Sequence, residues 1–368
     1  MSKSIILNKI AKVFNYFFQN KNVIIYNSFP DFSDNSFALY CYISNHFSNY
    51  TNIWQVNNIS LKEDYLKLAS NYTNIEKLEI VKKKSFPGIY YYLTSRIIFH
   101  THGIFNFFGL ISTQTKINLW HGMPIKKVGY FDSPNCAEPI SDYHVASSKF
   151  YQDIMSKVFG VSNKKVLITG QVRNDFLIQG KTSINKLFSQ KREFKKTILW
   201  MPTYRKSVIG DIRVDGKVNP DIDFLSEENL SRINKILIKT ESICYVKLHP
   251  MDYLQVEHFR SYSNLVFIDN DSFLDNGVAM YSVFNSVDIL LTDFSSIYID
   301  FMLLNKPIGF VFSDYDEFKN SRGFVFSDPK KYMPGDEGFE DAEKQFLESI
   351  KGRETVQEKV KRIKKSKK

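Results

Sequence analysis

The sequence lacks the signatures of several common classes of protein. It contains neither the GxGxxG motif of dinucleotide-binding folds nor the GxxxxGK[ST] loop of P-loop hydrolases. No motif therefore supports a dinucleotide-dependent oxidoreductase or a P-loop hydrolase. Nowhere do about 18 apolar residues follow one another, so we expect no membrane-spanning helix. The first 20 residues show no long apolar core and no small-residue cleavage site, so we expect no secretory signal.

Cysteine is scarce, with three residues in a chain of 368. Cys41, Cys136 and Cys244 are scattered and match no metal-ligand spacing, which favours a reducing compartment over a disulfide scaffold. The sequence calls for no cofactor, and it leaves the metal requirement open, since no set of metal ligands stands out in it. Arginines, lysines and helix dipoles can meet the charge of a ligand instead of a metal. These features predict a protein of the cytoplasm, or one that lies peripherally on the inner face of the cell membrane.

Basic residues are concentrated at one end of the chain. The formal net charge is +10, and the segment 351–368 contributes most of it with nine Lys or Arg and two Glu. The body is therefore close to neutral, which argues against nucleic-acid binding. The basic segment is either a solvated end or a patch attracted to anionic lipid, at about 1 kcal/mol per basic residue near the surface.

An amphipathic helix is predicted within residues 1–20. Apolar side chains recur there at three- and four-residue spacing, namely Ile6, Ile10, Val13, Phe14 and Phe17. Polar side chains fall on the opposite side, namely Lys9, Lys12, Asn15 and Gln19. Such a helix either docks on the first domain or lies in a lipid interface, and the sequence leaves both alternatives open.

Short apolar strands alternate with helical stretches through the rest of the chain. The strands predicted in the first half are Asn22–Tyr26, Asn52–Val56, Leu78–Val81, Ile97–His100, Ile117–Trp120, Tyr143–Ala146 and Val166–Thr169. Those predicted in the second half are Thr197–Trp200, Cys244–Lys247, Leu265–Ile268, Asp288–Leu291 and Ile308–Phe312. The predicted helices include Ser36–Phe47, Pro87–Ser95, Lys149–Phe159, Glu227–Lys239 and Ser296–Leu303.

This alternation predicts an α/β fold with two Rossmann-like domains, whose parallel sheets face a central cleft. We assign residues 21–180 to the first domain and 190–340 to the second. The charged stretch 181–196 is expected to link them. Residues 341–368 form a basic tail.

Polar segments follow five of the predicted strands directly. They are His121–Lys127, Gly170–Asp175, Met201–Arg205, Leu248–Pro250 and Thr292–Ser296. Ligands of open parallel sheets bind beyond the carboxyl ends of the strands. Each segment alone is weak evidence, since a histidine at a strand end is more often structural. Five segments on one side of two sheets indicate a binding site.

The side chains in these segments suit phosphate chemistry. Ser295 and Ser296 open a helix, where they either bind an anion with the first-turn amides or act only as caps. Lys126, Arg173 and Arg205 can offset the charge of a diphosphate. One histidine from each half can accept a proton or stabilise phosphoryl charge.

The order of these motifs resembles the CDP-glycerol glycerophosphotransferase family, the teichoic-acid primases and polymerases. An early loop, Phe29–Asn35, and the late segments Arg322–Phe324 and Pro334-Gly335 strengthen the resemblance, which spans roughly residues 22–336. Met123 and Val172 depart from the residues common in the family. The resemblance implies a GT-B fold, a CDP-polyol donor (CDP-glycerol or CDP-ribitol), and a polyol-phosphate or lipid-linked acceptor.

The resemblance also implies roles for particular residues. His121 and His249 are expected to be catalytic. The donor and its phosphates are expected to contact Lys126, Arg173, Asn174, Thr203, Arg205, Asp293, Ser295, Ser296 and Arg322. Asp34 and Asn35 are expected on the acceptor side.

Two other functions remain open at this stage. A GT-B glycosyltransferase would use a nucleotide sugar on the same fold and form a glycosidic bond. A non-catalytic adaptor at the membrane surface would have no need for the histidine pair. The sequence distinguishes neither primase from polymerase nor wall teichoic acid from capsule, and it says nothing of the oligomeric state.

Overall fold

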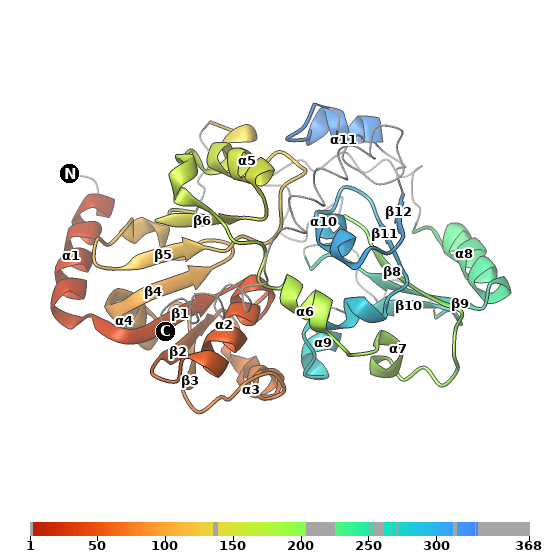
Figure 1. Ribbon diagram of the computed structural model, residues 1–368, viewed down its shortest axis with the longest axis horizontal. Helices are drawn as coiled ribbons and strands as arrows, with labels where there is room; N and C mark the ends of the chain where they lie inside the picture. Colours follow the sequence, from red (N-terminus) through yellow and green to blue (C-terminus); the bar gives the residue numbers. More distant parts are fainter. Residues whose placement is uncertain are drawn as a thin grey trace, which may run out of the picture. The chain divides into compact units, whose positions relative to one another are not determined.

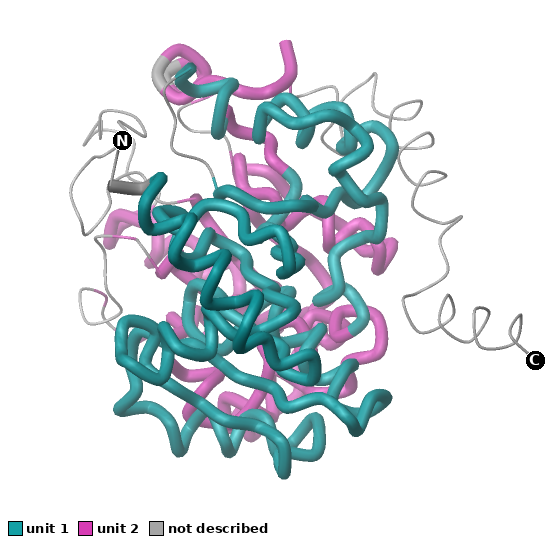
Figure 2. Tube along the Cα trace, turned by 90° about the vertical axis from the view of Figure 1, so that its left-hand side faces the viewer, with its two compact units in different colours: residues 1–123, 128–175, 348–368 teal, residues 124–127, 176–347 magenta. Residues whose placement is uncertain are grey.

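The computed structural model describes most of the chain, namely residues 3–134, 139–203, 225–250, 252, 259, 261–269, 271–311, 315–327 and 329. The chain divides into two compact units (Figure 2). Unit 1 contains residues 1–123, 128–175 and 348–368, and unit 2 contains residues 124–127 and 176–347. Each unit is built on one parallel sheet with helices packed on it, which confirms the predicted α/β fold class.

Unit 1 has a seven-stranded parallel sheet in the order β3-β2-β1-β4-β5-β6-β7 (Figure 1). The strands are β1 (Asn20–Asn27), β2 (Thr51–Val56), β3 (Leu78–Lys82), β4 (Ser95–His100), β5 (Thr115–Asn118), β6 (Tyr143–Ala146) and β7 (Val166–Ile168). The helices are α1 (Lys3–Phe18), α2 (Asp34–His46), α3 (Lys62–Ser70), α4 (Phe86–Thr94), α5 (Lys149–Phe159) and α6 (Asn174–Gln179). The strand order changes direction between β1 and β4, and ligands of open sheets bind at such a switch point.

Different helices cover the two faces of this sheet. Tyr26 of β1 belongs to an aromatic cluster on one face, where its ring lies 5.6 Å from that of Tyr40 in α2. The preceding Ile25 belongs to the core of the opposite face, together with Tyr92 of α4 and Ala11 of α1. The strand is therefore buried on both sides, which explains its continuous apolar run.

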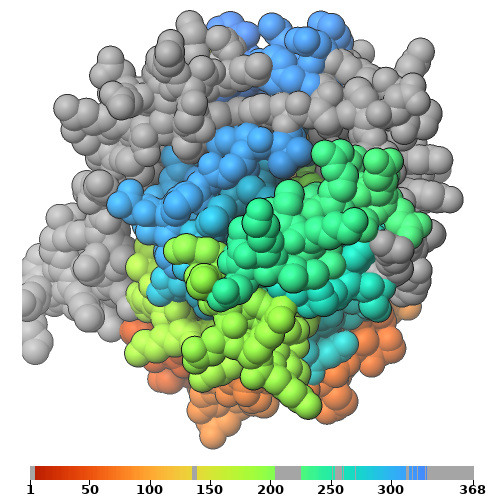
Figure 3. Space-filling view, turned by 90° about the vertical axis from the view of Figure 1, so that its right-hand side faces the viewer, coloured from red at the N-terminus to blue at the C-terminus, as the bar shows by residue number. Residues whose placement is uncertain are grey.

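Unit 2 has a five-stranded parallel sheet in the order β10-β9-β8-β11-β12. The strands are β8 (Lys196–Met201), β9 (Ser242–Lys247), β10 (Leu265–Ile268), β11 (Ile289–Thr292) and β12 (Ile308–Phe310). The helices are α7 (Ile184–Leu187), α8 (Glu227–Lys239), α9 (Ser272–Asp275), α10 (Ile297–Phe301) and α11 (Tyr315–Ser321). Helix α8 lies on the surface of this unit (Figure 3), and the switch point falls between β8 and β11.

Every strand predicted from the sequence overlaps a strand of the structure, but the strand before His121 is displaced. It was expected at Ile117–Trp120 and instead ends at Asn118. The reason is the backbone of Trp120, whose φ of 57° lies in the left-handed region and is incompatible with a strand. The predicted helix Ser296–Leu303 is split into α10 and a 3₁₀ turn over Met302–Leu304.

The stretch predicted as a linker belongs to unit 2. Residues 181–196, assigned to a linker from the sequence, include α7, whose Ile184 is fully buried.

Cys41 and Cys244 are free thiols in the interior. Cys136 and the basic segment 341–368 lie outside the described residues. Within the described part of the chain, no helix has the length and hydrophobicity needed to cross a bilayer.

The N-terminal helix α1 docks on unit 1 through its polar side. The Asn15 side chain is fully buried, and its Nδ2 donates to the carbonyl oxygens of Leu93 at 2.6 Å and Ser95 at 3.2 Å. One end of the helix is held in the same way, because Asn8 Nδ2 donates to the Leu110 carbonyl at 3.0 Å. Buried amide groups of this kind fix the orientation of the helix, since leaving them unpaired would cost about 1–3 kcal/mol each.

A buried lysine lies within the unit 1 sheet. Lys116 of β5 is 2% exposed, and its Nζ donates to the Ile104 carbonyl at 2.6 Å. The pKa of Lys116 is lowered from 10.5 to about 7, mainly by burial; the negative charge of Asp142 opposes the shift, and the positive charge of Lys83 adds to it. Between pH 7 and 10.5 the unfolded chain therefore binds this proton and the folded chain does not, so the free energy of unfolding rises with pH in that window.

Replacing Lys116 with methionine removes this dependence. We expect the free energy of unfolding of the wild type to rise more steeply than that of Lys116→Met between pH 7 and pH 9, because the variant has no proton to lose. Urea denaturation at fixed ionic strength measures both slopes. Lys164→Met, at an exposed position, is the control and should follow the wild type. Parallel curves for wild type and Lys116→Met would contradict the assignment.

Candidate functional site

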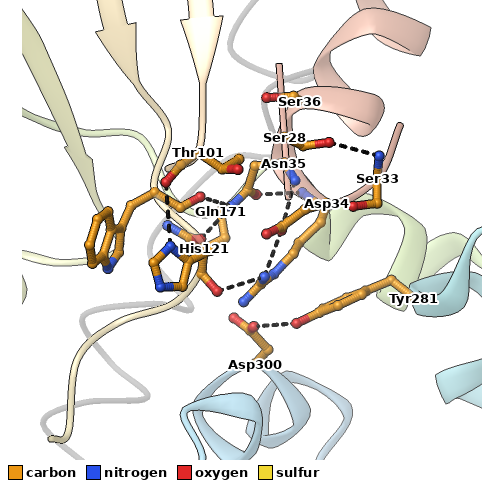
Figure 4. Close-up of polar contacts among 12 residues, drawn as sticks. Ser28, Ser33, Asp34, Asn35, Ser36, Thr101, His121, Gln171, Tyr281 and Asp300 are labelled. Atoms are coloured by element: carbon orange, nitrogen blue, oxygen red, sulfur yellow. Dashed lines mark hydrogen bonds and ion pairs between the residues drawn. The ribbon is translucent and has the colours of Figure 1, made fainter. Parts of the chain in front are cut away.

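The loops after β1, β4, β5 and β7 gather polar side chains at the carboxyl edge of the unit 1 sheet (Figure 4). Two of these loops, after β1 and β4, border the switch point of the sheet. The start of α2, which follows the loop after β1, carries the predicted acceptor-side residues Asp34 and Asn35, and the loop after β5 carries His121. The fold therefore brings these predicted residues together within one unit.

His121 lies in a turn with an unusual backbone. Trp120 has a φ of 57° and Gly122 a φ of 144°, so the chain turns sharply on both sides of the histidine. A left-handed tryptophan costs on the order of 1–3 kcal/mol unless its surroundings enforce it. Here they do, because Trp120 N donates to Asn118 Oδ1 at 3.0 Å and its carbonyl accepts from Asn35 Nδ2 at 2.9 Å.

One contact of the His121 ring assigns its tautomer. Its Nδ1 lies 3.3 Å from the carbonyl oxygen of Thr101, in the loop after β4 (Figure 4). A carbonyl oxygen can only accept, so Nδ1 carries the proton in this contact and Nε2 keeps its lone pair. The half-buried ring is thereby arranged as a general base through Nε2.

Arg173 connects the loop after β7 to the start of α2 and to the loop after β5. The residue is only 6% exposed, and its Nη1 donates to Asp34 Oδ1 at 2.6 Å and to the His121 carbonyl at 2.9 Å. Its backbone N–H donates to Asn35 Oδ1 at 3.1 Å, and Asn35 Nδ2 donates in turn to Gln171 Oε1 at 2.6 Å. These contacts hold the backbone of His121. Removing one partner of such a buried ion pair costs about 3–5 kcal/mol.

Two loops of unit 2 are joined at its own switch point. Asp293, directly after β11, is 1% exposed and accepts hydrogen bonds from Thr203, directly after β8. The Thr203 backbone N–H lies 2.9 Å and 3.1 Å from the two carboxylate oxygens, and Thr203 Oγ1 lies 2.6 Å from Oδ1. These hydrogen bonds hold the loops after β8 and β11 together at the switch point, where a ligand of the sheet is expected.

The two predicted serines follow Asp293 at the same edge. Ser295 and Ser296 are half-buried and lie directly before α10. Ser295 Oγ accepts from the Ile297 backbone N–H at 3.5 Å, whereas no side-chain capping bond is made by Ser296. The helix is five residues long, so its dipole is short.

His249 follows β9 at the carboxyl edge of the unit 2 sheet. All residues of this strand are buried, but the His249 side chain is exposed. The preceding Lys247 is 6% exposed, and its Nζ donates to the Leu248 carbonyl at 2.9 Å. Burial lowers the pKa of Lys247 to about 8, while Asp269 and Asp271 oppose the shift.

Lys126 and Arg322 come from two segments that pair within unit 2. Lys126 forms an antiparallel bridge with Phe324, and the Lys127 N–H donates to the Gly323 carbonyl at 3.1 Å. This places the half-buried Lys126 beside the chain that carries the 8%-exposed Arg322. Asn174 is half-buried at the start of α6. Arg205, Pro334 and Gly335 lie outside the described residues.

Three residues at the unit 1 site were not singled out from the sequence: Thr101, His102 and Gln171. Gln171 is 4% exposed and accepts from Asn35. The first two directly follow β4, so the rule that pointed to the other strand ends would also have found them. No three His, Cys, Asp or Glu side chains gather in a metal-binding arrangement among the described residues.

Comparison with known proteins identifies the family of this chain. A family model described as CDP-glycerol:poly(glycerophosphate) glycerophosphotransferase matches residues 10–367. The chain is 26% identical over 339 residues to a teichoic acid glycerol-phosphate transferase of Staphylococcus aureus (strain NCTC 8325 / PS 47), covering 86% of this chain and 80% of the relative. It is 28% identical over 296 residues to a teichoic acid poly(ribitol-phosphate) polymerase of Bacillus spizizenii (strain ATCC 23059 / NRRL B-14472 / W23), covering 71% and 43%.

The fold has a solved counterpart. The structure of the wall teichoic acid polymerase TagF superimposes with a TM-score of 0.65 at 19% identity, covering 95% of this chain and 88% of that one. This likeness supports the fold, and the family match supports the chemistry that the motifs predict. The chain belongs to the CDP-glycerol:poly(glycerophosphate) glycerophosphotransferase family and is a phosphotransferase.

Proposed function

We propose that this enzyme transfers glycerol phosphate from CDP-glycerol to the terminal hydroxyl of a polyol-phosphate chain on a lipid-linked acceptor, in teichoic-acid or related capsule synthesis. The acceptor oxygen attacks the β-phosphorus of the donor. The bond between that phosphorus and the bridging oxygen breaks, so CMP leaves and a phosphodiester forms. The hydroxyl proton passes to a base of the enzyme.

His121 is the proposed base. The contact that supports this role is the one between Nδ1 and the Thr101 carbonyl, which leaves the lone pair on Nε2. The imidazole also has a reference pKa of about 6.5, near neutral operating pH. The backbone of His121 is held by Arg173, so the ring is positioned before the substrate arrives.

Unit 2 is proposed to bind the donor. His249, Lys126 and Arg322, together with Arg205, supply positive or hydrogen-bonding groups for the two phosphates. Thr203 and Asp293 fix the loops at the switch point, and Ser295 and Ser296 add hydroxyl donors beside them. Stabilisation of the departing CMP phosphate by these groups accounts for most of the rate in this type of reaction.

The family description favours glycerol as the transferred polyol, although ribitol is named for one relative. CDP-ribitol is therefore the second candidate donor. Family membership also favours phosphoglycerol transfer over the transfer of a sugar from a nucleotide sugar. The ordered base at His121 argues against a non-catalytic adaptor.

Replacing His121 with alanine should abolish turnover and preserve the fold. We expect CMP release from CDP-glycerol to fall by about 100- to 10,000-fold, the usual contribution of a general base. Binding of CDP-glycerol, measured by calorimetry, should persist because unit 2 holds the donor. His46→Ala, at an exposed position of α2, is the matched control and should release CMP normally. Normal CMP release from His121→Ala would exclude this role.

We further propose that the enzyme associates peripherally with the inner, anionic membrane surface through α1. Because this helix docks by its polar side, its apolar residues face outward: Ile10 is 58%, Val13 59% and Phe17 71% exposed. Phe14 packs against α4, with its ring 6.4 Å from that of Tyr90. Exposed apolar side chains flanked by lysines are typical of helices that lie in a lipid interface.

Polar substitutions on this side of α1 should weaken membrane binding. We expect Val13→Ser with Phe17→Ser to lower association with phosphatidylglycerol-containing vesicles at least about tenfold, because each apolar side chain contributes roughly 1.5–3 kcal/mol when buried. Vesicle sedimentation measures the bound fraction. Ile236→Ser changes a similarly exposed side chain on α8 and should have no effect. Equal association of all three proteins would contradict this role of α1.

A further inference from the structure

A second histidine lies against the proposed base. The ring of His102 is parallel to that of His121 within 12°, and the ring centroids are 4.0 Å apart. The edge of Phe29 packs against His102 from the loop after β1, with centroids 5.5 Å apart at 73°. The Trp120 ring also lies 4.1 Å from His121. The base is therefore packed among aromatic rings.

Thr101 binds both histidine rings at once. Its carbonyl oxygen lies 3.3 Å from His121 Nδ1, and its Oγ1 lies 2.8 Å from His102 Nδ1. The same hydroxyl oxygen accepts from the Phe29 backbone N–H at 3.4 Å. The two contacts of Thr101 orient the His121 and His102 rings.

The loop that carries Thr101 and His102 is anchored in the interior of unit 1. The Gly103 N–H donates to Nδ1 of the fully buried His100, and Lys116 Nζ donates to the Ile104 carbonyl at 2.6 Å. Lys83 Nζ approaches the Gly103 carbonyl at 3.5 Å. Because main-chain groups of Gly103 and Ile104 are hydrogen-bonded to side chains in or beside the sheet, the position of the neighbouring His102 is fixed relative to the sheet.

We propose that His102 is a positioning residue for His121, an inference that rests on the proposed role of His121 as the base. Its flat ring prevents rotation of the His121 imidazole away from the Thr101 carbonyl. A neutral ring face also stabilises the positive charge that His121 acquires when it takes the acceptor proton. Both effects require a planar aromatic side chain at position 102, and packing against Phe29 and His121 keeps such a side chain in place.

Two substitutions at position 102 test whether the planarity of the side chain matters or only its volume. His102→Phe keeps a flat ring, whereas His102→Leu keeps bulk without one. We expect kcat for CMP release to fall about 10- to 100-fold in His102→Leu with little change in KM for CDP-glycerol, and to stay within about threefold of the wild type in His102→Phe.

Nitrogen-15 NMR of histidine-labelled protein without substrate tests the same inference independently of activity. His121→Asn assigns the His121 signals. The wild type should show the Nδ1–H tautomer and upfield-shifted ring protons. His102→Leu should show averaged tautomers and lose the upfield shift, whereas His102→Phe should keep both features.

Unchanged His121 signals and unchanged kcat in His102→Leu would overturn the proposal. Equal losses of kcat in His102→Phe and His102→Leu would also overturn it, because planarity would then be irrelevant. If the wild type releases no CMP, the proposed function fails, and the NMR comparison still decides whether His102 orients His121. His102→Met also lacks a flat ring and gives the same decision if His102→Leu does not fold.

Discussion

The hydrogen bonds that hold the backbone around His121 are the constraint on which the unit 1 site depends. The left-handed conformation at Trp120 is unfavourable, yet three polar main-chain groups of the turn have hydrogen-bond partners from other side chains. Trp120 N donates to Asn118, its carbonyl accepts from Asn35, and the His121 carbonyl accepts from Arg173. Because Arg173 is itself held by Asp34, the turn is stabilised by residues from the end of β5, the start of α2 and the loop after β7.

Unit 2 uses the same principle at its own switch point. A buried carboxylate after β11 accepts three hydrogen bonds from Thr203 after β8, which joins loops that are 90 residues apart in the sequence. In both units the polar residues at the strand ends therefore have two tasks. Some are proposed to meet the substrate, and others keep neighbouring loops in register so that the first group is already in place.

The positions of the strands were predictable from the sequence, because parallel strands buried on both faces appear as short apolar runs. The polar segments at their carboxyl ends were predictable for the same reason, and they include His121, His249, Thr203 and Asp293. The partners of these residues were not predictable. Arg173 was expected to meet a diphosphate, and its pairing with Asp34 joins residues 139 positions apart, which no local pattern records.

Two further features depended on tertiary structure alone. The stacking of His102 on His121 requires the loops after β4 and β5 to be adjacent, which follows from the strand order and not from either motif. The orientation of α1 could not be predicted from the sequence either. Its hydrophobic periodicity predicts a helix, but only the buried amide of Asn15 shows that the polar side faces the sheet.

The central claim is that this chain forms a phosphodiester by transferring a polyol phosphate from a CDP-linked donor. The most direct test incubates the full chain with a short glycerol-phosphate oligomer and, in separate reactions, with CDP-glycerol, CDP-ribitol or a nucleotide sugar, and follows nucleotide release together with the phosphorus-31 NMR spectrum. The account predicts CMP release from CDP-glycerol, faster than from CDP-ribitol, with one new phosphodiester signal for each CMP. Nucleotide release from the nucleotide sugar alone, with no new phosphodiester, would contradict it.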